Sequence, residues 1–599
     1  MNSNGNTPSM NLPTSDAPTT FHTLRTWPAG LLVALMIITR YGPNYLEGGL
    51  STYWMIAVFG PVLCSLLLVI WWLTASRATW KERVLGVLGL ISSLAITVTL
   101  ADRTMRGPGT INLTAPMGMM AFALASIFLG KHRPMKRTGV ALIVGLVGFG
   151  FSLLLRNEGM TGDYALGLHW RWSKTPEALM LADRKPQTPA PIVPPEATKT
   201  ADSPRIPEWP GFRGADRSGR SLGPKISTDW TTEPPKLLWK IAVGPAWSSF
   251  ALSGKQLFTQ EQRGTLETVA CYDADTGRQV WNQSLEARFD ESLGGPGPRA
   301  TPTLADGGLY VTGATGNLLR LNPTTGAVVW QQNLCEVAGR EVPIWGFAAS
   351  PLVTLSTVIV HAGGPRGKGL LGFNSETGAL RWSAPDGNDS YSSPQLNTIA
   401  GEELVIMLTN DGLILVDPAT GKTRLNYEWK FGNYRALQPS FLGDNTILLP
   451  TGMSTGTRAI RVAKTNDQLV AEELWTSRHM KPDFTDLLIY RGYAYGIDGG
   501  IFTCIDLKSG LRQWKGGRYG KGQALLLENS GLVLVAAEDG RVVLLRADSK
   551  EHAEVSSFKA LEGKTWNHPI LVGDRLYLRN AQEAACFQLP LANSKKSGT

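Results

Sequence analysis

The chain has 599 residues and carries 58 lysines and arginines against 49 aspartates and glutamates, which gives a formal net charge of +9. Part of this surplus lies in two short loops between apolar segments, and the rest of the chain has no basic run with interleaved aromatic residues. The charge therefore gives no indication of a nucleic-acid partner. The mean hydropathy of −0.06 averages an apolar N-terminal quarter and a more polar remainder.

The N-terminal part predicts an all-α membrane region. A polar leader over residues 1–23 precedes five apolar stretches, which we place near 24–41, 53–74, 84–101, 114–130 and 138–155. A helix needs about 20 apolar residues to cross a bilayer, so the second stretch is the clearest span and the first and fourth are marginal. We therefore expect about five transmembrane helices within residues 24–156.

The charged loops predict the orientation of these helices. Basic residues follow the second stretch (Arg77, Lys81, Arg83) and the fourth (Lys131, Arg133, Lys136, Arg137). Such loops stay in the cytoplasm, so an odd number of spans places everything after residue 156 outside it. The leader has neither a signal-cleavage pattern nor an early cysteine for a lipid anchor. We expect a multi-pass protein of the inner (cytoplasmic) membrane with its C-terminal part in the periplasm. If one marginal stretch does not cross the membrane, the C-terminal part would lie on the opposite side.

Three connecting segments follow: a juxtamembrane segment (157–183), a proline-rich linker (184–208) and a lead-in (209–233) that begins WPGFRGADRSG. Proline favours the polyproline II conformation, so we expect the linker to be an extended spacer. We expect the lead-in to form a plug that packs on the rim of the following domain, in preference to a ligand site.

A five-copy motif dominates the remaining two thirds of the chain: CYDADTGRQVW (271–281), RLNPTTGAVVW (320–330), GFNSETGALRW (372–382), LVDPATGKTRL (415–425) and CIDLKSGLRQW (504–514). Fixed offsets join an acidic or Asn residue, a Thr/Ser-Gly pair and usually a Trp. This pattern is expected of a tight hairpin whose Gly has a positive φ and whose Trp packs outward. The motif glycines lie 49, 52, 43 and 89 residues apart, and the last gap equals two periods.

Each period predicts one blade of a propeller. Short alternating runs such as GLYVTG and GNLLRL, separated by Gly, Asn or Asp turns, indicate four antiparallel strands per period, and such sheets must stack on their neighbours. Outer strands are expected at Trp239, Trp281, Trp330, Trp382, Leu425, Trp475, Trp514 and about Val555. The C-terminal stretch supplies only three strands, so residues 236–243 should complete its blade. We therefore predict an all-β eight-bladed propeller over residues 234–590, followed by a tail over 591–599.

The repeats resemble those of the pyrroloquinoline quinone (PQQ)-binding-like propeller superfamily, whose Trp-docking motif runs Ala-x-Asp-x-x-Thr-Gly-Lys/Arg-x-x-Trp. The first copy matches through Asp273, Thr276, Gly277, Arg278 and Trp281, and the last matches in part through Asp506, Ser509, Gly510 and Trp514. Leu425 replaces the Trp in the fourth copy, and the blade around 459–475 lacks the Gly turn. The superfamily includes quinoprotein dehydrogenases, an assembly lipoprotein that binds proteins, and membrane-anchored proteins of unassigned role, which this chain resembles most.

The resemblance predicts no cofactor with certainty. PQQ with calcium is the alternative that it leaves open. Soluble quinoprotein alcohol dehydrogenases carry two adjacent cysteines beside the cofactor, and haem attachment needs CxxCH, but neither pattern occurs here. The cysteines after the membrane region stand singly, and Cys271 and Cys504 share a blade position where a small buried side chain is expected. Membrane-bound quinoprotein glucose dehydrogenases have a similar layout of about five spans and eight blades, but their blades are longer.

The residues that open the inner strands are the candidate site residues, because they line the mouth of the central channel. Weak catalytic candidates are Asp483, Asp486 and His568, and cofactor-binding candidates are Trp247, Arg299, Trp345, Tyr391, Arg435, Trp566 and Asn567. Arginine pairs with carboxylates and tryptophan supplies a stacking face, so this set could bind an anionic quinone or a peptide. Alternatively, these polar groups only solvate a wet channel mouth. The oxygen donors of Asp483, Asp486 and Asn567 form no recognisable calcium pattern, so we predict no metal site.

Two functions follow from these observations. We expect a membrane-anchored periplasmic propeller that acts as a binding or scaffolding module for protein or small-ligand partners. The alternative is a PQQ- and calcium-dependent dehydrogenase that oxidises sugars or alcohols. The compact blades and the missing cysteine and haem motifs favour the binding module.

Overall fold

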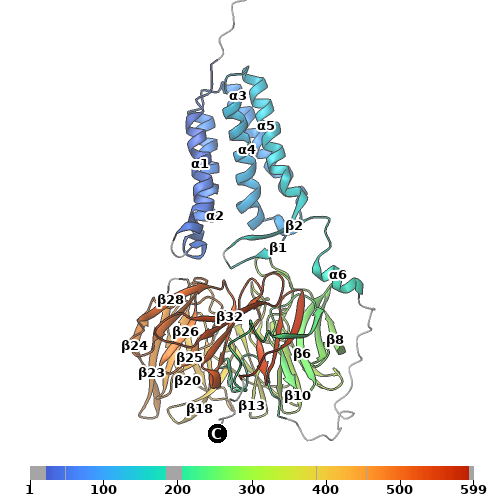
Figure 1. Ribbon diagram of the computed structural model, residues 1–599, viewed down its shortest axis with the longest axis vertical. Coiled ribbons are helices and arrows are strands. Elements are labelled where there is room, and N and C mark those ends of the chain that lie inside the picture. The colour runs from blue at the N-terminus through green and yellow to red at the C-terminus, as the bar shows by residue number, and fades with distance from the viewer. Residues whose placement is uncertain are drawn as a thin grey trace, which may run out of the picture. The chain divides into compact units, whose positions relative to one another are not determined.

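The computed structural model describes residues 22–46, 49–162, 164–183, 206–385, 387–453 and 455–592. The leader up to residue 21, the linker from 184 to 205 and the tail from 593 lie outside the described residues. The chain divides into two compact units, one of residues 1–157 with 168–171 and one of residues 158–167 with 172–599. The first is helical and the second is a propeller (Figure 1).

The helical unit contains the five predicted apolar helices. They are α1 (Trp27–Tyr41), α2 (Gly49–Thr74), α3 (Trp80–Leu100), α4 (Ala115–Phe128) and α5 (Pro134–Gly150), with short turns η1 (Gly42–Tyr45), η2 (Arg103–Met105), the π-helical η3 (Thr110–Thr114) and η4 (Phe151–Leu154). Among the described residues, four stretches are long and apolar enough to cross a membrane: Tyr53–Thr74, Trp80–Leu100, Thr110–Phe128 and Pro134–Leu154. The first helix, α1, has only 15 residues and is marginal as predicted, whereas the fourth stretch, also expected to be marginal, is long and apolar enough to cross.

Close packing and one buried ion pair hold these helices together. On α4, a Cβ at Gly118 would overlap the Phe149 ring of α5, so glycine permits the close approach. Arg137, one of the charges that predicted the orientation, lies inside this unit with its Nε 2.9 Å from Glu82 Oε1 of α3. The hydroxyl of Thr138 donates a second hydrogen bond of 2.8 Å to the same carboxylate. This buried carboxylate is therefore fully partnered, as such a group must be in an apolar environment.

The second unit is a propeller of eight antiparallel sheets, which confirms the predicted fold class. The first four blades are β5 (Ala251–Ser253), β6 (Gln256–Arg263), β7 (Leu266–Asp273) and β8 (Gln279–Glu286); β9 (Thr303–Ala305), β10 (Gly308–Thr312), β11 (Asn317–Leu321) and β12 (Val328–Asn333); β13 (Leu352–Thr354), β14 (Thr357–Gly364), β15 (Lys368–Asn374) and β16 (Leu380–Ala384); and β17 (Gln395–Ile399), β18 (Glu402–Leu408), β19 (Gly412–Val416) and β20 (Thr423–Glu428).

The other four blades are β21 (Ser440–Phe441), β22 (Thr446–Thr451), β23 (Gly456–Thr465) and β24 (Gln468–Ser477); β25 (Leu488–Tyr490), β26 (Tyr493–Asp498), β27 (Ile501–Asp506) and β28 (Arg512–Arg518); β29 (Gln523–Leu527), β30 (Leu532–Ala536), β31 (Arg541–Arg546) and β32 (Glu554–Lys559); and β33 (Ile570–Val572), β34 (Arg575–Arg579), β35 (Glu583–Gln588) and β4 (Lys236–Ala242). A short strand β3 (Arg220–Ser221) pairs in parallel with β29.

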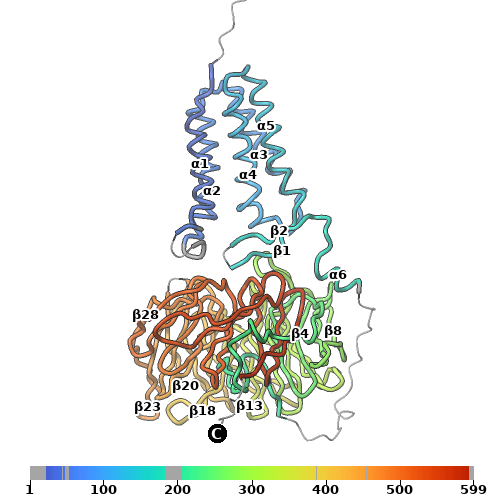
Figure 2. The backbone as a smooth tube through the Cα atoms, viewed as in Figure 1, coloured from blue at the N-terminus to red at the C-terminus, as the bar shows by residue number. Residues whose placement is uncertain are grey.

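The eighth blade is the predicted mixed blade. Its outer strand β4 comes from the start of the propeller and pairs antiparallel with β35, with Trp239 opposite Cys586. In Figure 2, β4 therefore lies beside the red C-terminal strands. This exchange joins the two ends of the propeller and covers a strand edge that would otherwise be open.

The motif tryptophans lie against the next blade, and not outward as the sequence suggested. Trp330 donates a 2.9 Å hydrogen bond from Nε1 to the carbonyl oxygen of Ser375. A Cβ at Gly378, whose φ is +73°, would lie 2.8 Å from the same indole. Equivalent bonds run from Trp239, Trp281, Trp382, Trp475 and Trp514 to the turn of the following blade. The Trp and the Gly of the motif are therefore two halves of one contact between blades.

The interface between the fourth and fifth blades lacks both halves of this contact. Leu425 stands in place of the Trp, and the facing turn has Asn466 and Asp467 at positive φ in place of Gly. Glu402 of the fourth blade instead pairs with Lys464 of the fifth at 3.0 Å, and Arg424 donates to the carbonyl oxygen of Asp467. Ionic and polar contacts thus replace the indole at this interface.

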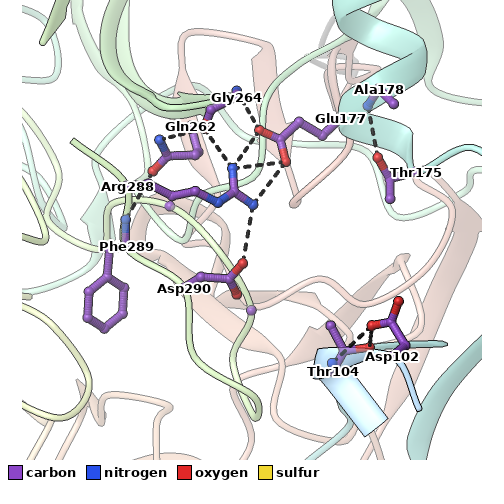
Figure 3. A network of polar contacts seen from close by, with 12 residues as sticks. Asp102, Thr104, Thr175, Glu177, Ala178, Gln262, Gly264, Arg288, Phe289 and Asp290 are labelled. Carbon is purple, nitrogen blue, oxygen red and sulfur yellow. Dashed lines mark hydrogen bonds and ion pairs between the residues drawn. The ribbon is translucent and has the colours of Figure 1, made fainter. Parts of the chain in front are cut away.

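A short helix and a hairpin precede the propeller. The hairpin of β1 (Leu155–Met160) and β2 (Leu166–Trp170) contains the boundary between the two units. Helix α6 (Pro176–Asp183) is fixed to the first blade by Glu177, which accepts hydrogen bonds from Gly264 N at 2.7 Å and Arg288 Nη1 at 3.1 Å (Figure 3). Arg288 also pairs with Asp290 at 3.2 Å. Among the described residues, two further short helices are α7 (Leu334–Ala338) and η6 (Glu528–Ser530).

Candidate functional site

The mouth of the propeller is the end of its channel at which the inner strands begin. Here a polar side chain of one blade accepts a hydrogen bond from the backbone of its neighbour. Four such bonds, of 2.6 to 3.0 Å, run to Thr301 from Ser249, to Ser350 from Thr301, to Ser393 from Ser350 and to Asp486 from Gln438. Many of the polar groups that open the inner strands therefore join blades, which fixes the shape of the mouth.

The lead-in enters the channel. Arg217 is 6% exposed and donates hydrogen bonds to the carbonyl oxygens of Ser350, Pro351 and Pro394, in the third and fourth blades. Arg213 donates to the carbonyl oxygen of Leu487 in the sixth blade at 3.2 Å. Because these contacts reach different sides of the ring, residues 209–219 form a plug inside the channel, and not on the rim as the sequence suggested.

Two of the catalytic candidates contact this plug. Asp486 is 2% exposed, and its Oδ2 lies 3.4 Å from Arg213 Nη1 and 3.6 Å from His568 Nε2. Burial and the positive charge of Arg213 hold the pKa of His568 well below its ordinary value, so the imidazole is neutral. The ring of Phe212 packs edge-on against His568 with centroids 4.9 Å apart. Asp486 thus neutralises the plug arginine.

Asp483 also has an internal cationic partner, whereas Oδ1 of Asn567 is buried without a hydrogen-bond partner among the described residues. Asp483 forms an ion pair with Lys521 and accepts a 3.4 Å hydrogen bond from Met453 N. The amide of Asn567 donates to the carbonyl oxygens of Ala246 and Ser248 at 3.1 and 2.7 Å. Within the described ranges, no three His, Cys, Asp or Glu side chains are grouped to hold a metal ion. These residues do not fit a calcium-assisted quinone site, because their carboxylates already have cationic partners.

Aromatic side chains gather on one side of the mouth. Trp566 lies between Trp247, at a centroid distance of 5.0 Å, and Phe484, at 5.9 Å. The ammonium group of Lys564 lies 4.2 Å from the centroid of Trp566 and 5.0 Å from that of Trp247, a cation–π arrangement. Burial lowers the pKa of Lys564 to about 8. Lys564 was not among the predicted site residues, because no repeat motif marks its position.

Arg299, the arginine nearest this cluster in the predicted set, stabilises its own loop. It pairs with Glu291 at 3.2 Å and donates to the carbonyl oxygen of Gly295 at 2.8 Å. Its guanidinium lies 4.7 Å from the centroid of the Phe289 ring. Burial lowers the pKa of Arg299 to about 10. This arginine therefore folds the loop before the second blade and has little donor capacity left for a ligand.

A second aromatic group contains the remaining candidates. Tyr434 packs edge-on against Trp345 at 5.3 Å and against Tyr391 at 6.2 Å between centroids. Arg435 lies 4.7 Å from the centroid of Trp429 and donates a 2.6 Å hydrogen bond to the carbonyl oxygen of Thr409. The predicted residues are thus divided between two aromatic groups and the plug, and they do not converge on one pocket.

The loops of the mouth also expose apolar side chains. The exposed fractions are 68% for Ile344, 37% for Tyr434, 41% for Met453 and 41% for Phe484. All four lie next to predicted site residues in the chain or in contacts given above. We call these four residues the apolar rim. The sequence did not single them out, because an isolated apolar residue in a loop carries no repeat signal.

Comparisons with known proteins find matches to the propeller repeats. A family described as "Outer membrane protein assembly factor BamB" matches residues 230–346 and 265–516. The outer membrane protein assembly factor BamB of Yersinia pestis is 22% identical over 339 residues, which cover 54% of this chain and 70% of the relative. A solved quinohemoprotein alcohol dehydrogenase from Pseudomonas putida HK5 is 12% identical with a TM-score of 0.45, over 65% of this chain and 81% of that one. The corresponding enzyme from Comamonas testosteroni is 13% identical with a TM-score of 0.44, over 67% and 83%.

Proposed function

Because the chain belongs to the PQQ-repeat β-propeller superfamily, we propose that it is a membrane-anchored module whose propeller mouth binds protein partners. The fold alone does not choose between binding and catalysis, since related propellers serve both. The choice therefore rests on the residues of the mouth.

The apolar rim is the observation that carries this proposal. Ile344, Tyr434, Met453 and Phe484 are exposed beside two aromatic groups at one end of the channel. Exposed apolar groups with polar residues between them are typical of protein interfaces, in which aromatic residues and arginine are enriched. The Yersinia pestis relative is named an outer membrane protein assembly factor, and an assembly factor acts on other proteins.

The chemistry of the mouth supports binding over oxidation. A calcium ion beside a quinone needs carboxylate oxygens that are free to coordinate it. Here Asp486 pairs with Arg213, and Asp483 pairs with Lys521. A cofactor would have to break these ion pairs, so we derive no redox step through this mouth.

We further propose that the helical unit crosses the inner membrane and that the propeller is periplasmic. The four long apolar stretches support the crossing. The basic residues of the α2–α3 and α4–α5 loops and of the first turns of α3 and α5 support a cytoplasmic side for those two loops. The short helix α1 decides whether the number of crossings is odd.

Substitution of the apolar rim tests the binding role. Ile344→Glu together with Phe484→Glu places two charges on the rim, and we expect crosslinked partners of the full-length protein to be lost from intact cells. Leu222→Glu is the matched control, because Leu222 is 68% exposed on the lead-in, away from the segments that form the mouth. Partners that survive the double substitution in a folded protein would contradict the proposed role of the mouth.

A further inference from the structure

The mouth already holds a piece of polypeptide, which comes from the chain itself. The end of β1 and the described residues of the turn that follows it (158–162 and 164–165), here called the hairpin tip, belong to the same compact unit as the propeller. The backbone N–H of Met160 donates to the carbonyl oxygen of Leu293 at 2.8 Å, and Lys564 Nζ donates to the carbonyl oxygen of Met160 at 2.9 Å. The N–H of Gly162 donates to Glu538 Oε1 at 2.6 Å. The mouth thus binds this turn through its main chain.

Two glycines allow the hairpin tip to approach so closely. Gly159 has a φ of +94°, and a Cβ at this residue would lie 2.9 Å from the carbonyl oxygen of Leu293 and 3.0 Å from Lys564 Nζ. A Cβ at Gly162 would overlap the side chain of Lys521. A side chain at either position would therefore push the turn away from the mouth.

The groups that receive the hairpin tip are held in place by the propeller. Glu538 Oε1 also accepts a 3.0 Å hydrogen bond from Trp566 Nε1, and Glu538 Oε2 accepts one of 2.9 Å from Lys521 N. Lys564 lies over the rings of Trp247 and Trp566. A carboxylate and an ammonium group fixed in this way form a preorganised pair of acceptor and donor, which favours binding because little freedom is lost.

We propose that this part of the mouth is a binding site for a glycine-containing turn of a polypeptide, and that the hairpin tip occupies it until a partner's turn takes its place. The inference rests on the proposed binding role and specifies the chemistry of the partner: a turn presenting N–H, C=O and N–H groups, with glycines three residues apart. The apolar rim would then contact the side chains that flank the partner's turn.

Competition between the hairpin tip and the partner has a measurable consequence. An internal segment acts at a high effective concentration, and the apparent dissociation constant rises as the fraction of open mouth falls. If the hairpin tip is docked in more than about nine molecules in ten, its release should tighten the binding of an added turn at least about tenfold.

The test uses the full-length protein in detergent micelles and a labelled peptide of residues 155–170, cyclised through added terminal cysteines. Gly162→Val should release the hairpin tip, because a larger side chain meets Lys521, and should increase peptide affinity at least about tenfold over wild type. Gly432→Val is the matched control, since a Cβ at Gly432 meets no atom within 4 Å. Adding Glu538→Gln to Gly162→Val should weaken peptide binding by about tenfold through loss of a charged hydrogen bond.

A second measurement needs no substitution. Hydrogen exchange of the Met160 and Gly162 amides in the wild-type protein should be slow, and saturating peptide should accelerate it. Equal peptide affinity for wild type and Gly162→Val, absence of binding to a folded Gly162→Val protein, or rapid exchange of both amides would each overturn the inference. If partner crosslinks still require the apolar rim in that case, the proposed function stands and only the hairpin-tip site fails.

Discussion

Asp486 and Arg213 form a buried ion pair inside the channel, and each side chain is 2% exposed. The pair ties the plug to the sixth blade, to which Asp486 belongs. Asp486 also accepts a 2.6 Å hydrogen bond from Gln438 N of the fifth blade. Burying two paired charges costs free energy, but burying one charge without its partner costs more. The carboxylate is therefore a structural partner of the plug in this propeller.

This arrangement predicts a large effect for a nearly isosteric change. Asp486→Asn removes the negative charge and leaves Arg213 buried without it, so we expect a loss of about 3 to 5 kcal/mol in unfolding free energy. Denaturant titration followed by tryptophan fluorescence measures it. Asp539→Asn is the control, because Asp539 pairs with Arg541 at the surface, where such pairs contribute about 1 kcal/mol or less. Equal losses for the two variants would contradict a charge-held plug.

The paired tryptophan and glycine are the elements that join the blades. Trp330 is 8% exposed and lies on the glycine turn of the next blade. Trp330→Ala removes this indole and its hydrogen bond, so we expect the free energy of unfolding of the propeller to fall by about 3 to 5 kcal/mol. The interface that contains Leu425 is the internal control. Because the turn that faces Leu425 has no glycine, Leu425→Trp should not raise the free energy of unfolding. A stabilising Leu425→Trp would show that the turn does not select the indole.

The repeated elements could be predicted from the sequence because each leaves a local signal. Gly277, Trp281 and their equivalents recur at fixed offsets, which predicts the hairpins, the eight outer strands and the mixed blade that β4 completes. The direction of the tryptophans could not be predicted, because a motif inside one blade does not show what the next blade offers. For the same reason, the sequence showed Leu425 and the turn without glycine at Asn466 as two separate departures from the motif. It did not show that they face each other across one interface.

The candidate site was less predictable than the fold. The positions that open the inner strands could be located, and Trp247, Phe484 and Trp566 do meet there. The plug and the hairpin tip occur once each, so no periodicity marks them. Their docking depends on contacts between residues far apart in the sequence, such as the hydrogen bond between Lys564 and Met160.

At the scale of the whole molecule, we propose that a membrane anchor carries a periplasmic propeller. An alkaline phosphatase fused after residue 592 should be active, whereas one inserted after Lys131, between α4 and α5, should be inactive. The positive charges of the α2–α3 and α4–α5 loops are the physical reason. Activity in the reverse pattern would mean that the α4–α5 loop is periplasmic and that the propeller is cytoplasmic.

The binding role of the mouth is the central claim, and photocrosslinking in living cells tests it most directly. A photoreactive phenylalanine analogue is placed at Ile344 or Phe484 on the apolar rim, or at Leu222 as the exposed control, and adducts are identified by mass spectrometry. The account predicts discrete protein adducts from the two rim positions and none of the same adducts from Leu222. Adducts that are equally abundant at all three positions, or absent from the rim of a folded protein, would contradict it.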